Sequence, residues 1–203
     1  MSQIALPLAA GSGAGPQRIV CGNANAAVIE ALGQPETWPF RTAVLRGPAR
    51  SGKSLLAQWF GAGGKGEAID DAHRQDETAL FHRWNRAQET GTPLLLVAGE
   101  GEWAITLPDL ASRLGAALHL EIGTPDDAML GELVAAHAEA RGLALGPDAA
   151  AYLVPRAERS HLGVERLVAA IDRLSLERKQ APTMAIWRDA LEETLGASQP
   201  RLL

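Results

Sequence analysis

The sequence is poor in cysteine, tyrosine and aromatic residues, with one cysteine, one tyrosine and an aromatic content of 4%. A single cysteine, Cys21, can form neither an intramolecular disulfide nor a zinc cluster, which favours a reducing cytoplasm as the compartment. No apolar run approaches the roughly 18 residues of a membrane-spanning helix. Residues 1–3 carry no basic side chain, so we expect no signal peptide and a protein that is not in the membrane.

An excess of positive charge is also missing, since the formal net charge is −5 and the isoelectric point is near 5.6. Proteins that bind nucleic acid strongly need lysine and arginine to neutralise phosphates. We therefore expect no strong direct nucleic-acid binding, and protein partners instead. A chain of 203 residues with 46% hydrophobic content can bury the core of one α/β domain with a small appendage.

Residues 47–54 match the phosphate-binding loop pattern G-x-x-x-x-G-K-[ST]. In such a loop the backbone N–H groups surround a phosphate, the lysine reaches the β- and γ-phosphates, and the final hydroxyl ligates Mg²⁺. A strand-like run at 41–46 precedes the loop and a helix-like run at 55–60 follows it, which a plain glycine-serine turn would not require. The sequence thus predicts binding of ADP or ATP with Mg²⁺ by Gly47, Pro48, Ala49, Arg50, Ser51, Gly52, Lys53 and Ser54.

A pair of acids follows the next strand-like run, in Ala-Ile-Asp-Asp-Ala at 68–72. In nucleotide hydrolases one acid at this place holds Mg²⁺ and the next orients the attacking water. We assign Asp70 to the metal with Ser54, and Asp71 to the water; the alternative is a solvated turn. His73 and His82 are interpreted as surface or loop residues rather than ligands.

Hydrophobic periodicity predicts an α/β P-loop core with a mostly parallel sheet between helices, followed by a small all-helical lid. Five strands are expected, near 19–21, 42–46, 67–70, 94–98 and 118–122. A helix at 77–89 has Asp76 as its cap. From Gly123 on only helices are expected, one with Thr124 as its cap that ends near Gly142, and others at about 147–155, 160–178 and 183–195. The expected domains are 1–15, a tip and linker; 16–122, the core; and 123–203, the lid.

A P-loop core followed by a helical lid resembles the AAA+ ATPases, and Ile69-Asp70-Asp71 resembles the acidic motif of their DnaA-related group. Residues 107–114, Leu-Pro-Asp-Leu-Ala-Ser-Arg-Leu, resemble the segment that carries an arginine finger in the Hda proteins of that group, the regulatory inactivators of DnaA. The resemblance implies that Arg113 acts in trans on ATP bound to DnaA. It implies a negative regulator of DNA replication initiation that promotes this hydrolysis together with the sliding clamp.

The N-terminal residues resemble the clamp-binding peptide of the same group. The resemblance implies clamp contacts by Gln3, Ile4, Leu6, Pro7 and Leu8, joined to the body by a glycine- and alanine-rich linker. The alternative is an ordinary N-terminal strand or tail. The expected partners are DnaA and the β subunit of DNA polymerase III, which is the sliding clamp, with a homodimer left open.

Two positions depart from the AAA+ pattern. The strand that should end in a polar side chain facing the γ-phosphate ends in Val97-Ala98-Gly99-Glu100, and the lid position expected to hold an arginine aligns with Glu165. Arg166 and Arg159 are the candidates for the lid contact. We therefore expect weak or no intrinsic ATPase activity. An autonomous P-loop ATPase, acting as an adaptor or loader in DNA metabolism, and a small-molecule P-loop kinase remain as alternatives.

Overall fold

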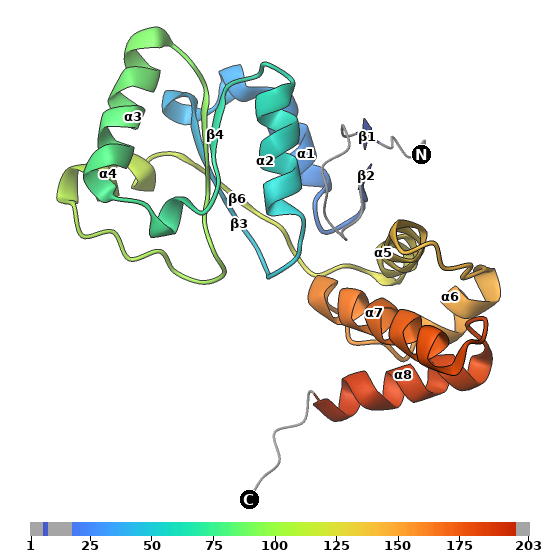
Figure 1. Cartoon of the computed structure of the whole chain (residues 1–203). Coiled ribbons are helices and arrows are strands. Elements are labelled where there is room, and N and C mark those ends of the chain that lie inside the picture. Colours follow the sequence, from blue (N-terminus) through green and yellow to red (C-terminus); the bar gives the residue numbers. More distant parts are fainter. Residues whose placement is uncertain (1–5, 8–17, 198–203) are drawn as a thin grey trace, which may run out of the picture. The chain divides into compact units, whose positions relative to one another are not determined.

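A computed structural model describes residues 6–7 and 18–197 of the chain (Figure 1). These residues form two compact units. The α/β unit contains residues 25–123, and the helical unit contains the residues from Thr124 on together with the described residues before Asn25.

The α/β unit is built on four strands that are all parallel, in the order β4-β5-β3-β6. Their bounds are β3 (Thr42–Arg46), β4 (Glu67–Ile69), β5 (Leu94–Val97) and β6 (Leu118–Glu121). β5 is buried at every position, as expected for a strand with helices on both sides. The predicted fold class, a mostly parallel sheet between helices followed by helices alone, is confirmed.

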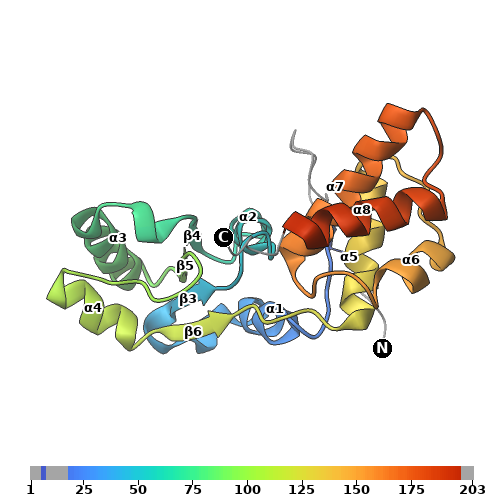
Figure 2. The ribbon, with the colours of Figure 1, turned by 90° about the horizontal axis from the view of Figure 1, so that it is seen from below.

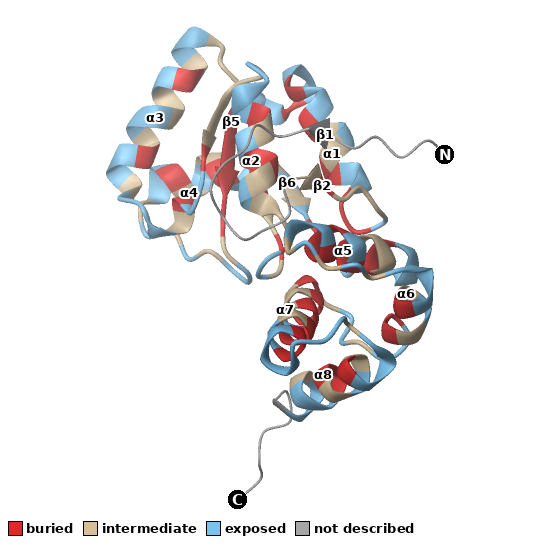
Figure 3. Ribbon diagram, turned by 45° about the vertical axis from the view of Figure 1, so that its right-hand side comes forward, coloured by how far each residue is buried: buried red, intermediate tan, exposed pale blue. Residues whose placement is uncertain are grey.

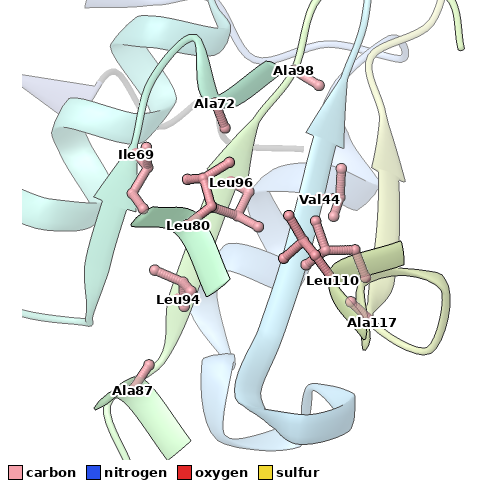
Figure 4. Close-up of a cluster of buried hydrophobic side chains, with 11 residues drawn as sticks. Val44, Ile69, Ala72, Leu80, Ala87, Leu94, Leu96, Ala98, Leu110 and Ala117 are labelled. Carbon is pink, nitrogen blue, oxygen red and sulfur yellow. The ribbon is translucent and has the colours of Figure 1, made fainter. Parts of the chain in front are cut away.

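Helices flank the sheet on both sides. α3 (Glu77–Thr90) and α4 (Pro108–Gly115) pack on one face through a cluster that includes Val44, Leu80, Leu96 and Leu110 (Figure 4). α1 (Ala26–Gly33) and α2 (Lys53–Ala62) lie on the other side (Figure 1). Short 3-10 turns complete the unit at η1 (Pro35–Thr37), η2 (Pro39–Arg41) and η3 (Ala72–Arg74).

The strand expected near 19–21 is not part of the parallel sheet, and that prediction was wrong. β2 (Arg18–Ile19) instead pairs antiparallel with β1 (Leu6–Pro7) and belongs to the helical unit. A few residues later the chain packs closely on the first helix of that unit, where a Cβ on Gly22 would lie 2.7 Å from Cγ of Met129. Apolar alternation alone could not reveal which unit this segment joins.

The helical unit contains α5 (Asp127–Ala140), α6 (Pro147–Leu153), α7 (His161–Arg178) and α8 (Met184–Ala197), close to the predicted ranges (Figure 2). Each of these helices contributes buried residues to the core of the unit (Figure 3). Asp126, and not Thr124, caps α5, because its carboxylate accepts a 2.8 Å hydrogen bond from the N–H of Met129. Within residues 18–197 no helix combines the length and apolarity needed to cross a membrane.

Candidate functional site

The loop at 47–54 joins β3 to α2, as its sequence predicted. Its two glycines are needed for different reasons. Gly47 has φ +154°, and a Cβ there would lie 2.9 Å from Cβ of Ile122 at the end of β6. Gly52 has a left-handed φ of +88° but open space around the place of its Cβ. Glycine at position 47 is thus favoured by its backbone conformation and by the close approach of Ile122, and glycine at position 52 by its backbone conformation alone.

Unpaired donors gather at the start of α2. The first N–H groups of a helix have no partner inside it, and with the helix dipole they favour an anion. The hydroxyl of Ser51 is buried and has no hydrogen-bond partner among the described residues. Ser54 is the second residue of α2 and is exposed. These groups fit the phosphates of a nucleotide, with Ser54 and Asp70 as the side chains that would hold Mg²⁺.

Lys53 is held against the loop that precedes it. Its Nζ donates hydrogen bonds of 2.7 Å to the carbonyls of Gly47 and Pro48. Burial lowers the pKa of the Lys53 ammonium, and the negative charges of Glu100, Asp70 and Asp71 act in the opposite direction. Both predicted acids are therefore electrostatically coupled to the predicted lysine. Glu100 also acts on Lys53, although the sequence gave it no role. It follows β5, which lies next to β3 in the sheet, and the loop with Lys53 follows β3.

Asp70 and Asp71 are both exposed and lie just after β4. Oδ1 of Asp70 accepts a 3.0 Å hydrogen bond from the N–H of Asp71. Asp71 has a left-handed backbone with φ 48°, which is uncommon for a residue with a side chain and often occurs at functional sites. Residues 18–197 contain no cluster of three or more metal-ligating side chains. Mg²⁺ at a phosphate loop needs only one or two protein ligands, since phosphate and water supply the others.

His73 has a role that the sequence interpretation missed. Its Nδ1 accepts a 3.1 Å hydrogen bond from the backbone N–H of Gly99, so the half-buried ring connects the turn after the acids to the loop after β5. A histidine two residues after the paired acids was the available signal, but periodicity could not show what it contacts.

Arg113 lies in the last turn of α4, and its side chain packs on α3. The guanidinium carbon lies 4.3 Å from the ring centroid of Phe81 and 4.5 Å from that of Trp84. Nη1 donates a 2.6 Å hydrogen bond to Oδ1 of Asn85. The side chain is half-buried and has a defined orientation. Its cationic head is stabilised by two π faces and one amide oxygen.

The start of α4 is fixed by a second contact with α3. The carboxylate of Glu77 accepts hydrogen bonds from the N–H of Thr106, the hydroxyl of Thr106 and the N–H of Leu107. These hydrogen bonds lower the pKa of Glu77. Glu77 and Arg113 therefore attach opposite ends of α4 to the same helix.

The two arginines proposed for the lid contact lie in the helical unit. Arg159 forms an exposed ion pair of 2.6 Å with Asp127, and Arg166 is exposed on α7. Of the predicted clamp-binding residues, Leu6 and Pro7 form β1. Gln3, Ile4 and Leu8 lie outside the described residues. The roles of these residues stay predictions.

No family model matches this sequence. The structure is similar to domain III of the replication initiation protein DnaA from Thermotoga maritima, with a TM-score of 0.71 and 14% identity over 93% of this chain and 99% of that one. It is also similar to AMPPCP-bound DnaA from Aquifex aeolicus, with a TM-score of 0.59 and 17% identity over 83% of this chain and 68% of that one. A third similar structure is the RuvB Holliday junction branch migration motor of Thermotoga maritima, with a TM-score of 0.59 and 19% identity over 84% and 68% of the two chains. The chain therefore shares its fold with these DnaA and RuvB structures.

Proposed function

We propose that this chain is a nucleotide-binding regulator that acts with the sliding clamp to promote hydrolysis of ATP bound to DnaA, and so inhibits DNA replication initiation. The observation that carries the proposal is an arginine, Arg113, held in one orientation on a DnaA-like fold. An arginine that is already oriented on its own domain loses less side-chain entropy when a partner binds.

The nucleotide, ADP or ATP, is proposed to bind at residues 47–54. The carbonyl contacts of Lys53, the buried Ser51 hydroxyl and the exposed start of α2 support it. Lys53→Ala should abolish ADP binding in calorimetry. Lys65→Ala is the matched control, because the Lys65 ammonium lies over the Trp59 ring outside the loop and its loss should leave the affinity unchanged. Unchanged ADP affinity for Lys53→Ala would rule out this site.

Hydrolysis by the chain itself is proposed to be slow. β5 runs into Ala98, which is buried and has no polar group to offer a γ-phosphate. In the proposed complex the ATP belongs to DnaA, and Arg113 adds positive charge where negative charge develops on the γ-phosphate. Arginine fingers raise rates by about 10³–10⁵ in GTPases, so one side chain can account for most of the effect.

The decisive experiment follows DnaA-bound ATP over time in the presence of DNA-loaded clamp. Wild-type protein should accelerate its loss. Arg113→Ala should not, and Arg113→Lys should also fail because an ammonium lacks the planar guanidinium fork. Arg86→Ala, an exposed arginine on α3, is the control and should behave as wild type. Wild-type rates with Arg113→Ala would refute the finger role.

Clamp binding is proposed for residues 3–8. Replacing Gln3 and Leu6 with alanine removes an amide and an apolar anchor, each worth on the order of 1–3 kcal/mol at an interface. Clamp affinity in surface plasmon resonance should fall at least tenfold, while ADP affinity should not change. Normal clamp binding by a chain lacking residues 1–10 would show that the assignment is wrong.

The second candidate, an autonomous ATPase adaptor, is favoured by one observation, the left-handed backbone of Asp71 beside Asp70. Asparagine tolerates this conformation, so Asp71→Asn removes the charge with little strain. Rapid single-turnover hydrolysis by the isolated wild-type protein that is lost in Asp71→Asn would favour this candidate over the first.

A further inference from the structure

The imidazole of His73 occupies the space beside Gly99. Besides the 3.1 Å hydrogen bond from the Gly99 N–H to Nδ1, a Cβ built on Gly99 would lie 3.0 Å from Nε2 and 3.3 Å from Cε1 of the ring. A side chain at position 99 would therefore require the ring to shift by a few tenths of an ångström. Glycine at this position makes room for a side chain that comes from η3, the turn after β4.

The hydrophobic core holds this arrangement in place. Ala72 and Ala98, the residues directly before His73 and Gly99, are both buried in the cluster between the sheet and α3 and α4 (Figure 4). The N–H of Ala98 donates a 2.9 Å hydrogen bond to the carbonyl of Leu45, near the end of β3 and two residues before the phosphate-binding loop. The ring thus lies beside the segment after β5, whose first residue, Ala98, is hydrogen-bonded to β3.

The hydrogen bond decides which nitrogen of the ring carries the proton. Since Nδ1 accepts from Gly99, the proton of a neutral imidazole is on Nε2, which is then a donor. The charged side chains coupled to Lys53 in this region are the carboxylates of Glu100, Asp70 and Asp71, which repel a phosphate. Ala98 supplies no donor. Nε2–H of His73, on a ring hydrogen-bonded to the residue before Glu100, is therefore a donor close in the chain to the carboxylates that are coupled to Lys53.

We propose that His73 is a nucleotide-binding residue that donates a hydrogen bond from Nε2 to the γ-phosphate of a bound nucleoside triphosphate, and so distinguishes ATP from ADP. The inference rests on the proposed nucleotide site at residues 47–54. A lysine at the end of a phosphate loop reaches the β- and γ-phosphates, and Lys53 is coupled to the carboxylates that follow β4 and β5. The γ-phosphate would therefore lie near the ends of these two strands. His73 reaches the same edge of the sheet from the turn after β4.

The test compares the affinities of ADP and of the non-hydrolysable ATP analogue AMPPCP by calorimetry. His73→Ala should weaken AMPPCP binding about tenfold, as expected for one hydrogen bond to a charged group, and leave ADP binding within about twofold of wild type. Gly99→Ala should act in the same direction with a smaller effect, because its methyl group pushes against the ring without removing it. His73→Gln, which keeps an N–H donor at a similar reach, should recover part of the loss.

Two controls separate this effect from general destabilisation. His82→Ala removes an exposed histidine on α3, and Gly61→Ala adds a methyl group with no atom within 4 Å, so both should bind like wild type. An equal loss of ADP and AMPPCP affinity in His73→Ala and Gly99→Ala would overturn the inference, because the ring would then only support the backbone. Unchanged affinities for both nucleotides would overturn it too. ADP binding that survives Lys53→Ala would instead refute the nucleotide site itself.

Discussion

Nη1 of Arg113 donates a 2.6 Å hydrogen bond to Oδ1 of Asn85, which joins the end of α4 to the middle of α3. The residue proposed to act on a partner's nucleotide therefore also holds two helices of its own domain together. Loss of this side chain should affect folding as well as function, so the two effects have to be measured separately.

Arg113→Ala should lower the free energy of unfolding by about 1–2 kcal/mol, since it removes two cation–π contacts and one hydrogen bond. Arg113→Lys should lose less stability, because an ammonium can keep part of the contact with the aromatic rings. Urea denaturation measures both. Arg86→Ala should stay within about 0.5 kcal/mol of wild type. A wild-type unfolding midpoint for Arg113→Ala would mean that the contacts with α3 add nothing to stability.

Glu77 should make stability depend on pH. Hydrogen bonds from Thr106 and Leu107 lower its pKa in the folded state, so its contribution is complete above the unfolded pKa of about 4.3. That contribution disappears as the pH falls through the lower, folded pKa. Glu77→Gln should therefore have a lower free energy of unfolding than wild type at pH 7. The difference between the two proteins should become smaller in acid. Urea midpoints between pH 7 and 3 would show this, with Glu89→Gln, an exposed acid of the same helix, as the control. A stability difference that does not change with pH would contradict the lowered pKa of Glu77.

The two loop glycines should respond differently to alanine. Gly52→Ala adds only the strain of a left-handed residue, about 1–2 kcal/mol. Gly47→Ala combines unfavourable φ with a contact of 2.9 Å between its methyl group and Cβ of Ile122, and should cost roughly 1–3 kcal/mol more. Thermal unfolding would rank the two variants. Equal losses of stability in the two variants would show that Ile122 moves aside without an energetic cost.

Glu100→Gln should lower the pKa of Lys53 further. Burial already lowers that pKa, and the Glu100 carboxylate is the first among the nearby charges that counteract it. Without this negative charge, less opposes the effect of burial, so the pKa of Lys53 should fall. A pH titration of the lysine side-chain NMR signals would measure the change, with Glu102→Gln as an exposed control on the same loop. A Lys53 titration that does not change would show that Glu100 is too well solvated to matter.

The sequence by itself determined the phosphate-binding loop, the parallel strands from β3 to β6 and the helices that follow Thr124. Each depends on local patterns: turn glycines, short apolar runs, and caps such as Asp76 and Ser160, which both accept the expected backbone hydrogen bonds. The placement of Asp70 and Asp71 near Lys53 also followed, because the carboxyl ends of parallel strands meet at one edge.

Only the tertiary structure decided which partners the other side chains meet. His73 pairs with Gly99, and Arg113 packs on Phe81 and Trp84. The segment that contains Arg18–Ile19 joins the helical unit, where Gly22 lies against Met129. Such contacts depend on how whole elements pack, and periodicity describes only the face that one element buries. The sequence therefore placed the phosphate loop, and the fold selected the histidine beside it.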